Sequence, residues 1–181
     1  RYLFRISILI IIMTLTTATA SADKYTRAWK KVEEFIEQDL PESAAKVITQ
    51  IWDMAADDGD GRQMLKSAVY LTQVQQTFSE KGIPDGIELF NTLMPSLKVK
   101  EHKALCHAFL AKGYMTYWNQ NRYNISRMRP SDEENLPLQH WTAKMICDTI
   151  CYHLDQSINL AGDVGSGFYE EFFPGGNKAG M

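Results

Sequence analysis

The apolar residues of this chain recur at intervals of three and four positions from residue 23 to about residue 160. That spacing lines up side chains along one face of a helix, whereas a half-buried strand would alternate at every second position. The sequence therefore predicts an all-α fold. The segment is long enough for one domain with a real core but hardly for two, so we expect a single helical domain over residues 23–160.

About six helices are predicted, and Pro and Gly residues separate most of them. Their expected ranges are 25–39, 41–56, 62–81, 84–97, 100–123 and 140–160. Their expected core faces consist of Tyr25, Ala28, Trp29, Val32, Phe35 and Ile36; Ala44, Val47, Ile48, Ile51, Met54 and Ala55; Met64, Ala68, Leu71, Val74 and Phe78; Ile87, Phe90, Leu93, Met94 and Leu97; Ala104, Ala108, Ala111, Met115 and Trp118.

Short connections favour antiparallel helical hairpins, because a few residues allow the chain only to reverse direction. Pro41 and Glu42 suit the first turn of the second helix, which predicts such a hairpin at the start of the domain. The longest helix, residues 100–123, is expected to be central, and residues 127–137 are expected to form a loop. The hairpins could stack as a tetratricopeptide-like solenoid or close into a bundle, and the sequence leaves both arrangements open.

Residues 1–22 have the features of a signal peptide. Arg1 and Arg5 precede an apolar run from Ile6 to Leu15 that is too short to span a bilayer, and small residues follow. Cleavage is expected after Ala22, with Ala20 as an alternative position, and an uncleaved signal anchor is the competing interpretation. We therefore expect export to the periplasm, the cell envelope or the extracellular space.

The rest of the chain is acidic and ends in an unusual tail. Once Arg1 and Arg5 are set aside, 17 Lys and Arg oppose 22 Asp and Glu, which disfavours nucleic acid as a partner. Residues 161–181 are rich in Gly and Phe and cannot continue a helix. Because the chain starts with Arg1 and this tail leads to no clear stop signal, we expect a fragment whose tail leads to a downstream region.

No cofactor or metal site is predicted. Cys106, Cys147 and Cys151 are expected to fill the core as free thiols rather than to form a disulfide, and a zinc site of Cys147, Cys151 and His153 is disfavoured because these side chains do not share one helix face. Residues 57–61 lack the ligands of a calcium loop and predict a turn. His102 and His107 are expected on different faces of one helix.

No catalytic set is predicted either. The chain has no Gly-x-Ser-x-Gly nucleophile motif and no phosphate-binding loop. The best candidate for a specific contact is the end of the fifth helix, where amides, an arginine and aromatic rings lie together; the alternative is that these groups cap the helix and fill the core. The candidate interaction residues are Trp118, Asn119, Asn121, Arg122 and Tyr123.

Several segments carry a family resemblance. They are Leu40-Pro41-Glu42-Ser43-Ala44, the run from Glu101 to Tyr123, Trp141-Thr142, and His153-Leu-Asp-Gln-Ser-Ile158. Together they resemble the helical N-terminal region of large bacterial alpha-2-macroglobulin-like proteins. The resemblance implies an exported protease trap in which β-sandwich domains and a thioester domain follow this region. The family's Cys-x-Glu-Gln thioester motif is absent from the chain, so no trapping residue is transferred.

The resulting hypothesis is a non-catalytic, exported helical scaffold at the N-terminus of such a protein. Its expected partners are downstream domains of the same chain or a cell-envelope protein. The alternative is a stand-alone tetratricopeptide-like module that binds a peptide or protein of the cell envelope. An enzymatic function is not expected, because no acid, base or nucleophile set converges.

Overall fold

The computed structural model describes residues 24–131, 135–162, 167–170 and 172, and all regular structure in these ranges is helical. A helix over residues 24–37 comes first. The elements that follow are α2 (Pro41–Asp58), α3 (Gly61–Gln75), α4 (Gly82–Leu93), the 3₁₀ turn η1 (Met94–Ser96), α5 (Lys100–Ile125), the 3₁₀ turn η2 (Leu138–His140), α6 (Ala143–Ala161) and the short α7 (Gly167–Glu170). The predicted all-α class is therefore confirmed, while the signal peptide and most of the tail lie outside the described residues.

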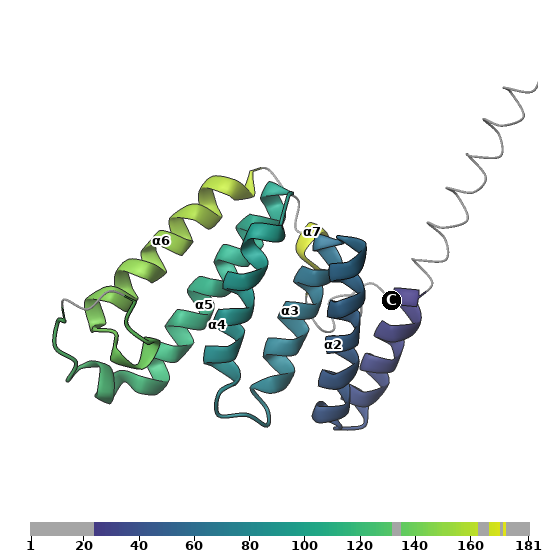
Figure 1. Cartoon of the computed structure of the whole chain (residues 1–181), viewed down its shortest axis with the longest axis horizontal. Helices are drawn as coiled ribbons and strands as arrows, with labels where there is room; N and C mark the ends of the chain where they lie inside the picture. The colour runs from purple at the N-terminus through teal and green to yellow at the C-terminus, as the bar shows by residue number, and fades with distance from the viewer. Residues whose placement is uncertain (1–23, 132–134, 163–166, 171, 173–181) are drawn as a thin grey trace, which may run out of the picture.

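The helices form a row in which successive members run in opposite directions (Figure 1). Helix α3 packs against α2 and α4, α4 packs against α5, and α5 makes its most extensive contact with α6. Helices α3 and α5 also touch each other directly, so α4 lies beside both of them. Each helix thus buries its apolar face against its neighbours in the row.

The first two helices have the predicted hairpin form, with a short connection between them (Figure 1). Pro41 occupies the first turn of α2, where its missing N–H costs nothing. Tyr25, Trp29 and Val32 are buried as predicted. Ile36 was expected in the core and is 40 % exposed, so that prediction is wrong; it lies near the end of its helix, beyond the reach of the neighbouring apolar face.

The segment 57–61 forms the predicted turn between α2 and α3. Gly59 adopts the left-handed conformation (φ 66°) that ends many helices, and its N–H reaches back to carbonyls of the last turn. Asp60 then begins α3, and its Oδ1 accepts hydrogen bonds from the N–H groups of Arg62 and Gln63. Asp58 instead accepts from Tyr25 Oη at 2.6 Å and pairs with Lys24, which ties the first helix to this turn.

The boundary between α3 and α4 differs from the prediction. Helix α3 ends at Gln75 rather than near Lys81, and Phe78, expected in its core face, lies in the following turn with 43 % of its surface exposed. Gly82 was expected to stop a helix but is the first residue of α4. A Cβ on Gly82 would lie 2.9 Å from the Gln75 backbone carbonyl carbon, so this Gly permits a tight helix crossing that single-sequence reasoning cannot see.

Helix α5 is long, as predicted, but its buried face was only partly identified. Ala104 and Ala111 are buried, whereas Met115 is 47 % exposed, so its assignment to the core is wrong. The side chains that do fill the interface include His107 and Tyr114, which the search for apolar residues passed over. Neighbouring helices lie on more than one side of α5, and a single apolar stripe therefore describes it poorly.

The C-terminal part of the fold corrects the prediction for two cysteines. Cys106 is fully buried, but Cys147 and Cys151 are exposed on α6, which is the last long helix of the row and has one open side (Figure 1). His140, expected inside the last helix, lies in η2, and α6 begins three residues later.

Beyond α6, the two described Phe residues of the tail find a place to pack, as expected. Phe172 is fully buried and Phe168 is half-buried, and both rings contact the imidazole of His102 on α5. Helix α6 ends at Ala161, and the Gly162 that follows has φ 58°, so the predicted end of the helix is confirmed.

Candidate interaction sites

The candidate site predicted from the sequence lies at the C-terminal end of α5. Asn121 departs from helical geometry there (φ −112°, ψ 15°), and its Nδ2 donates a hydrogen bond to the Tyr117 carbonyl at 2.9 Å. Trp118 is half-buried and packs against the core. Thus Trp118 and Asn121 have structural roles at a kink in the helix.

The other predicted residues of this site face solvent. Asn119 and Arg122 are exposed, and Tyr123 has 71 % of its surface exposed. Arg127 lies over the Tyr123 ring, 5.1 Å from its centroid, and donates a hydrogen bond from Nη1 to Tyr123 Oη at 2.7 Å. The five predicted residues therefore split between the core and the surface, and they do not converge on one cavity.

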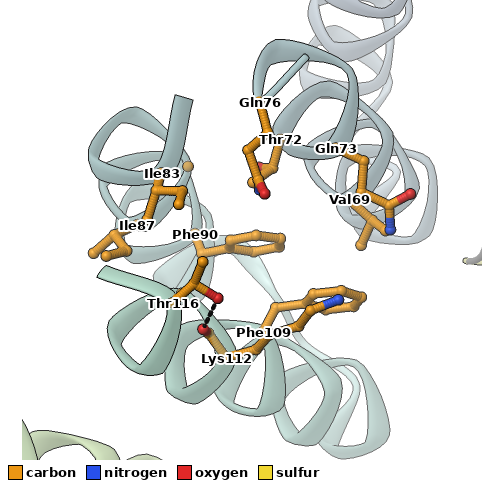
Figure 2. A pocket seen from close by; sticks show the side chains of 12 residues that line it. Val69, Thr72, Gln73, Gln76, Ile83, Ile87, Phe90, Phe109, Lys112 and Thr116 are labelled. Carbon is orange, nitrogen blue, oxygen red and sulfur yellow. Dashed lines mark hydrogen bonds between the residues drawn. The ribbon is translucent and has the colours of Figure 1, made fainter. Parts of the chain in front are cut away.

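A cleft that the sequence did not reveal lies between α3, α4 and α5 (Figure 2). Its floor includes the rings of Phe90 and Phe109, which stack nearly parallel with centroids 5.3 Å apart. Val69, Ile83 and Ile87 complete the apolar wall. The enclosed volume is about 40 Å³, enough for a few water molecules or the branched end of one apolar side chain.

Two Gly residues create this cleft by letting the helix backbones approach. A Cβ on Gly86 would lie 2.5 Å from Thr72 Cγ2, and a Cβ on Gly113 would lie 2.9 Å from Ile87 Cγ1. Real Cβ atoms do not come so close to other atoms, so larger residues would push α4 away from α3 or α5. The shape of the cleft thus depends on helix contacts that are far apart in sequence.

Polar groups line the upper part of the cleft. Lys112 is its only charged lining residue and makes no ion pair with a described residue, while Gln73 and Gln76 supply side-chain amides. Thr116 donates its hydroxyl to the Lys112 carbonyl at 2.8 Å, as the dashed line in Figure 2 shows. Thr72 Oγ1 is buried without a hydrogen-bond partner among the described residues. A buried hydroxyl without a partner is costly, which marks this wall of the cleft as incomplete.

A second unexpected feature is a pair of buried histidines between α5 and α6. His107 Nδ1 and His153 Nδ1 are 2.8 Å apart, so one imidazole donates a hydrogen bond to the other. Burial and the charge of Lys103 lower the pKa of His107, and burial together with the neighbouring imidazole lowers the pKa of His153 to about 4. Both rings are therefore neutral at pH 7.

Aromatic rings surround this histidine pair. The Tyr114 ring stacks on His153 with centroids 5.8 Å apart and on Trp141 with centroids 5.6 Å apart. Tyr152 meets both imidazoles edge-on. Tyr114 and Trp141 also line an open groove of about 490 Å³ between α4, α5 and η2, whose only charged lining residue is Glu88.

None of these groups offers a catalytic or metal-binding set. Within the described ranges, no three His, Cys, Asp or Glu side chains are arranged to hold a metal ion. Burial raises the pKa of the Cys106 thiol to about 12, and its Sγ contacts the Phe90 carbonyl, so it is a packed and unreactive group. What these surfaces can do chemically is bind.

Comparisons with known proteins give no assignment. No protein-family model, curated protein or solved structure matches the chain. In the part of the chain that the structure describes, none of the helices combines the length and the apolar character needed to cross a membrane.

Proposed function

We propose that this chain is a non-catalytic helical interaction module that binds an extended segment of a partner protein in the cleft between α3, α4 and α5. The observation that carries the proposal is the cleft itself: an apolar floor, side-chain amides and one unpaired lysine lie together between helices. This combination suits a peptide, because an apolar side chain can fill the floor while amides bind its backbone.

The helix arrangement supports a tetratricopeptide-like solenoid as the scaffold. Helices α3 and α5 touch with α4 beside them, and Trp29 of the first helix packs on Tyr70 of α3 with ring centroids 4.8 Å apart. The odd-numbered members of the row thus share one side, as stacked hairpins require.

The sequence of α4 supports the same architecture. The second half of the tetratricopeptide pattern reads Ala-x₃-Phe followed by Pro. In α4 and the following turn, Gly86, Phe90 and Pro95 occupy corresponding places, with Gly substituted for Ala. Gly86 meets Thr72 of α3 at the crossing where a small residue is needed. The first half of the pattern is not present in full, and the solenoid stays a proposal.

The chemistry of the cleft specifies its partner. Lys112 calls for an anionic group, and the Phe90–Phe109 floor calls for a small or branched apolar group within a few ångströms of it. The proposed ligand is therefore a peptide segment in which Val, Ile or Leu is adjacent to Asp, Glu or a terminal carboxylate. Thr72 Oγ1 offers a further hydrogen bond.

A peptide selection tests this proposal. Phage-displayed random dodecapeptides are selected on the immobilised protein, and enriched peptides are synthesised and titrated by fluorescence anisotropy. We expect a consensus with an apolar residue beside an acidic one. Lys112→Gln should weaken binding about two- to fivefold, the range of an exposed charge pair, while Lys46→Gln on α2 serves as the matched control.

A filling variant gives the sharper result. Gln73→Trp should occupy the cleft and weaken binding at least about tenfold, because the peptide side chain loses its apolar seat. A lack of enriched peptides, or enriched peptides that bind Gln73→Trp and Lys112→Gln as tightly as the original protein, would contradict the proposal.

We further propose that the module is exported and forms the N-terminal part of an alpha-2-macroglobulin-like protein, where it contacts downstream domains or an envelope partner. The resemblance of residues 40–44, 101–123, 141–142 and 153–158 supports this context. The sequence of the gene beyond residue 181 tests it: a long continuation with β-sandwich patterning agrees with the proposal, and an immediate stop codon would leave the stand-alone peptide-binding module.

A further inference from the structure

The histidine pair occupies a critical position in the last hairpin of the row. Helix α6 has only two fully buried side chains in its described part, Ile146 and His153. The remaining contacts of α6 with the core come from half-buried side chains such as Ile150. His153 therefore supplies a large share of what holds α6 against α5.

The geometry of the pair makes this attachment depend on protons. At 2.8 Å, one Nδ1 must donate and the other must accept, so at least one Nδ1 has to be unprotonated. A first proton can be accommodated, because an imidazolium still donates to a neutral partner. A second proton leaves two N–H donors and two like charges facing each other in a buried site.

The surroundings add little that would offset this repulsion. Lys103 on α5 contributes further positive charge, and no carboxylate of the described residues contributes to the pKa shift of either imidazole. The other titratable groups around the pair are the phenols of Tyr114 on α5 and Tyr152 on α6. Their rings can attract an imidazolium, but only weakly compared with two unscreened like charges.

We propose that His107 and His153 form a proton-operated clamp: the neutral pair holds α6 against α5, and double protonation releases α6 together with the Trp141 segment. The aromatic stack links the two, because the Tyr114 ring lies between His153 and Trp141. Release would also open the groove of about 490 Å³ that Tyr114 and Trp141 line. This device goes beyond the proposed peptide binding and does not depend on it.

The first test is an NMR titration of the histidine side chains in the whole chain. The exposed His140 should titrate near the ordinary value of about 6.5, whereas His107 and His153 should titrate in two coupled steps at lower pH. Equal midpoints for all three rings would overturn the clamp.

Hydrogen exchange, corrected for the intrinsic effect of pH, tests the release itself. Between pH 7 and pH 4 we expect protection of the α6 amides to fall at least about tenfold, while α2 keeps its protection. His107→Asn should remove most of this pH dependence, because an amide replaces the Nδ1 contact without titrating. His140→Asn is the matched control and should behave like the original protein.

A second variant protects the test against a folding failure. His153→Phe can still stack on Tyr114 and cannot be protonated, so α6 should stay closed at pH 4. Uniform loss of protection in α2 and α6, or an unchanged pH response in both variants, would contradict the proposal. Failure of the peptide selection leaves these readouts unaffected, so the two proposals can fail separately.

Discussion

Gly86 and Thr72 form the closest crossing between α4 and α3: a Cβ added to Gly86 would lie 2.5 Å from Thr72 Cγ2 and 2.9 Å from Thr72 Oγ1. The contact closes one side of the cleft and covers the Thr72 hydroxyl. The helix conformation of Gly86 suits any residue, so its role is steric rather than conformational.

Gly86→Ala should therefore destabilise the protein. Overpacking costs about 1–3 kcal/mol and outweighs the gain of about 1 kcal/mol that Ala brings to a helix interior. Urea unfolding followed by circular dichroism measures the change. Thr72→Ala in the same chain removes both atoms in the way, so the double variant should recover most of the loss. An equal loss in single and double variants would show that the crossing is not the cause.

Asp60→Ala should cost about 1 kcal/mol of unfolding free energy, because Asp60 Oδ1 accepts the Arg62 and Gln63 N–H groups at the start of α3. Asp57→Ala is a suitable control. Asp57 lies in the last turn of α2, where a negative charge is slightly unfavourable. Chemical denaturation of both variants gives the comparison. Equal effects from the two substitutions would contradict the assigned cap.

The three cysteines should differ sharply in reactivity. Cys147 and Cys151 are exposed, so both should react readily with a thiol reagent at pH 8. Cys106 is buried, and its pKa is raised to about 12, so it should react at least about a hundredfold more slowly until the protein unfolds. A time course with Ellman's reagent, with and without denaturant, counts the two classes. Three equally fast thiols would show that Cys106 is not packed as described.

Stability should fall with acid through the histidine pair. The pKa of His153 is lowered from the ordinary 6.5 to about 4 in the fold, so between these values the unfolded chain binds a proton that the folded chain does not. The full contribution of the pair is present above pH 6.5 and declines as pH drops towards 4. At about 1.36 kcal/mol per pKa unit, the loss attributable to His153 is roughly 3 kcal/mol.

The measurement is urea unfolding at a series of pH values. Because carboxylates also titrate as pH approaches 4, the informative quantity is the difference between the original protein and His153→Asn. The original protein should lose more stability than the variant over this window. Parallel curves would mean that His153 is not kept neutral by the fold.

Local patterns identified much of the candidate core. Periodicity located the long helices, Pro41 marked the start of α2, and the residues 57–61 gave a turn with the predicted caps. These features depend on neighbours within one or two turns, which a single sequence contains. The predicted interaction segment was less informative, because the same amides and rings serve a helix kink at Asn121 and an exposed stack at Tyr123.

The sequence by itself determined the helical class, the approximate helix ranges and most of the apolar faces, because helix formation and amphipathic burial follow from residue spacing. Only the tertiary structure decided which helices meet. It brought Gly86 to Thr72, and it placed His153 against His107 although 46 positions separate them in the chain. It also left Cys147 and Cys151 exposed, because α6 lies at the end of the row and apolar spacing alone cannot show which helix has an open side.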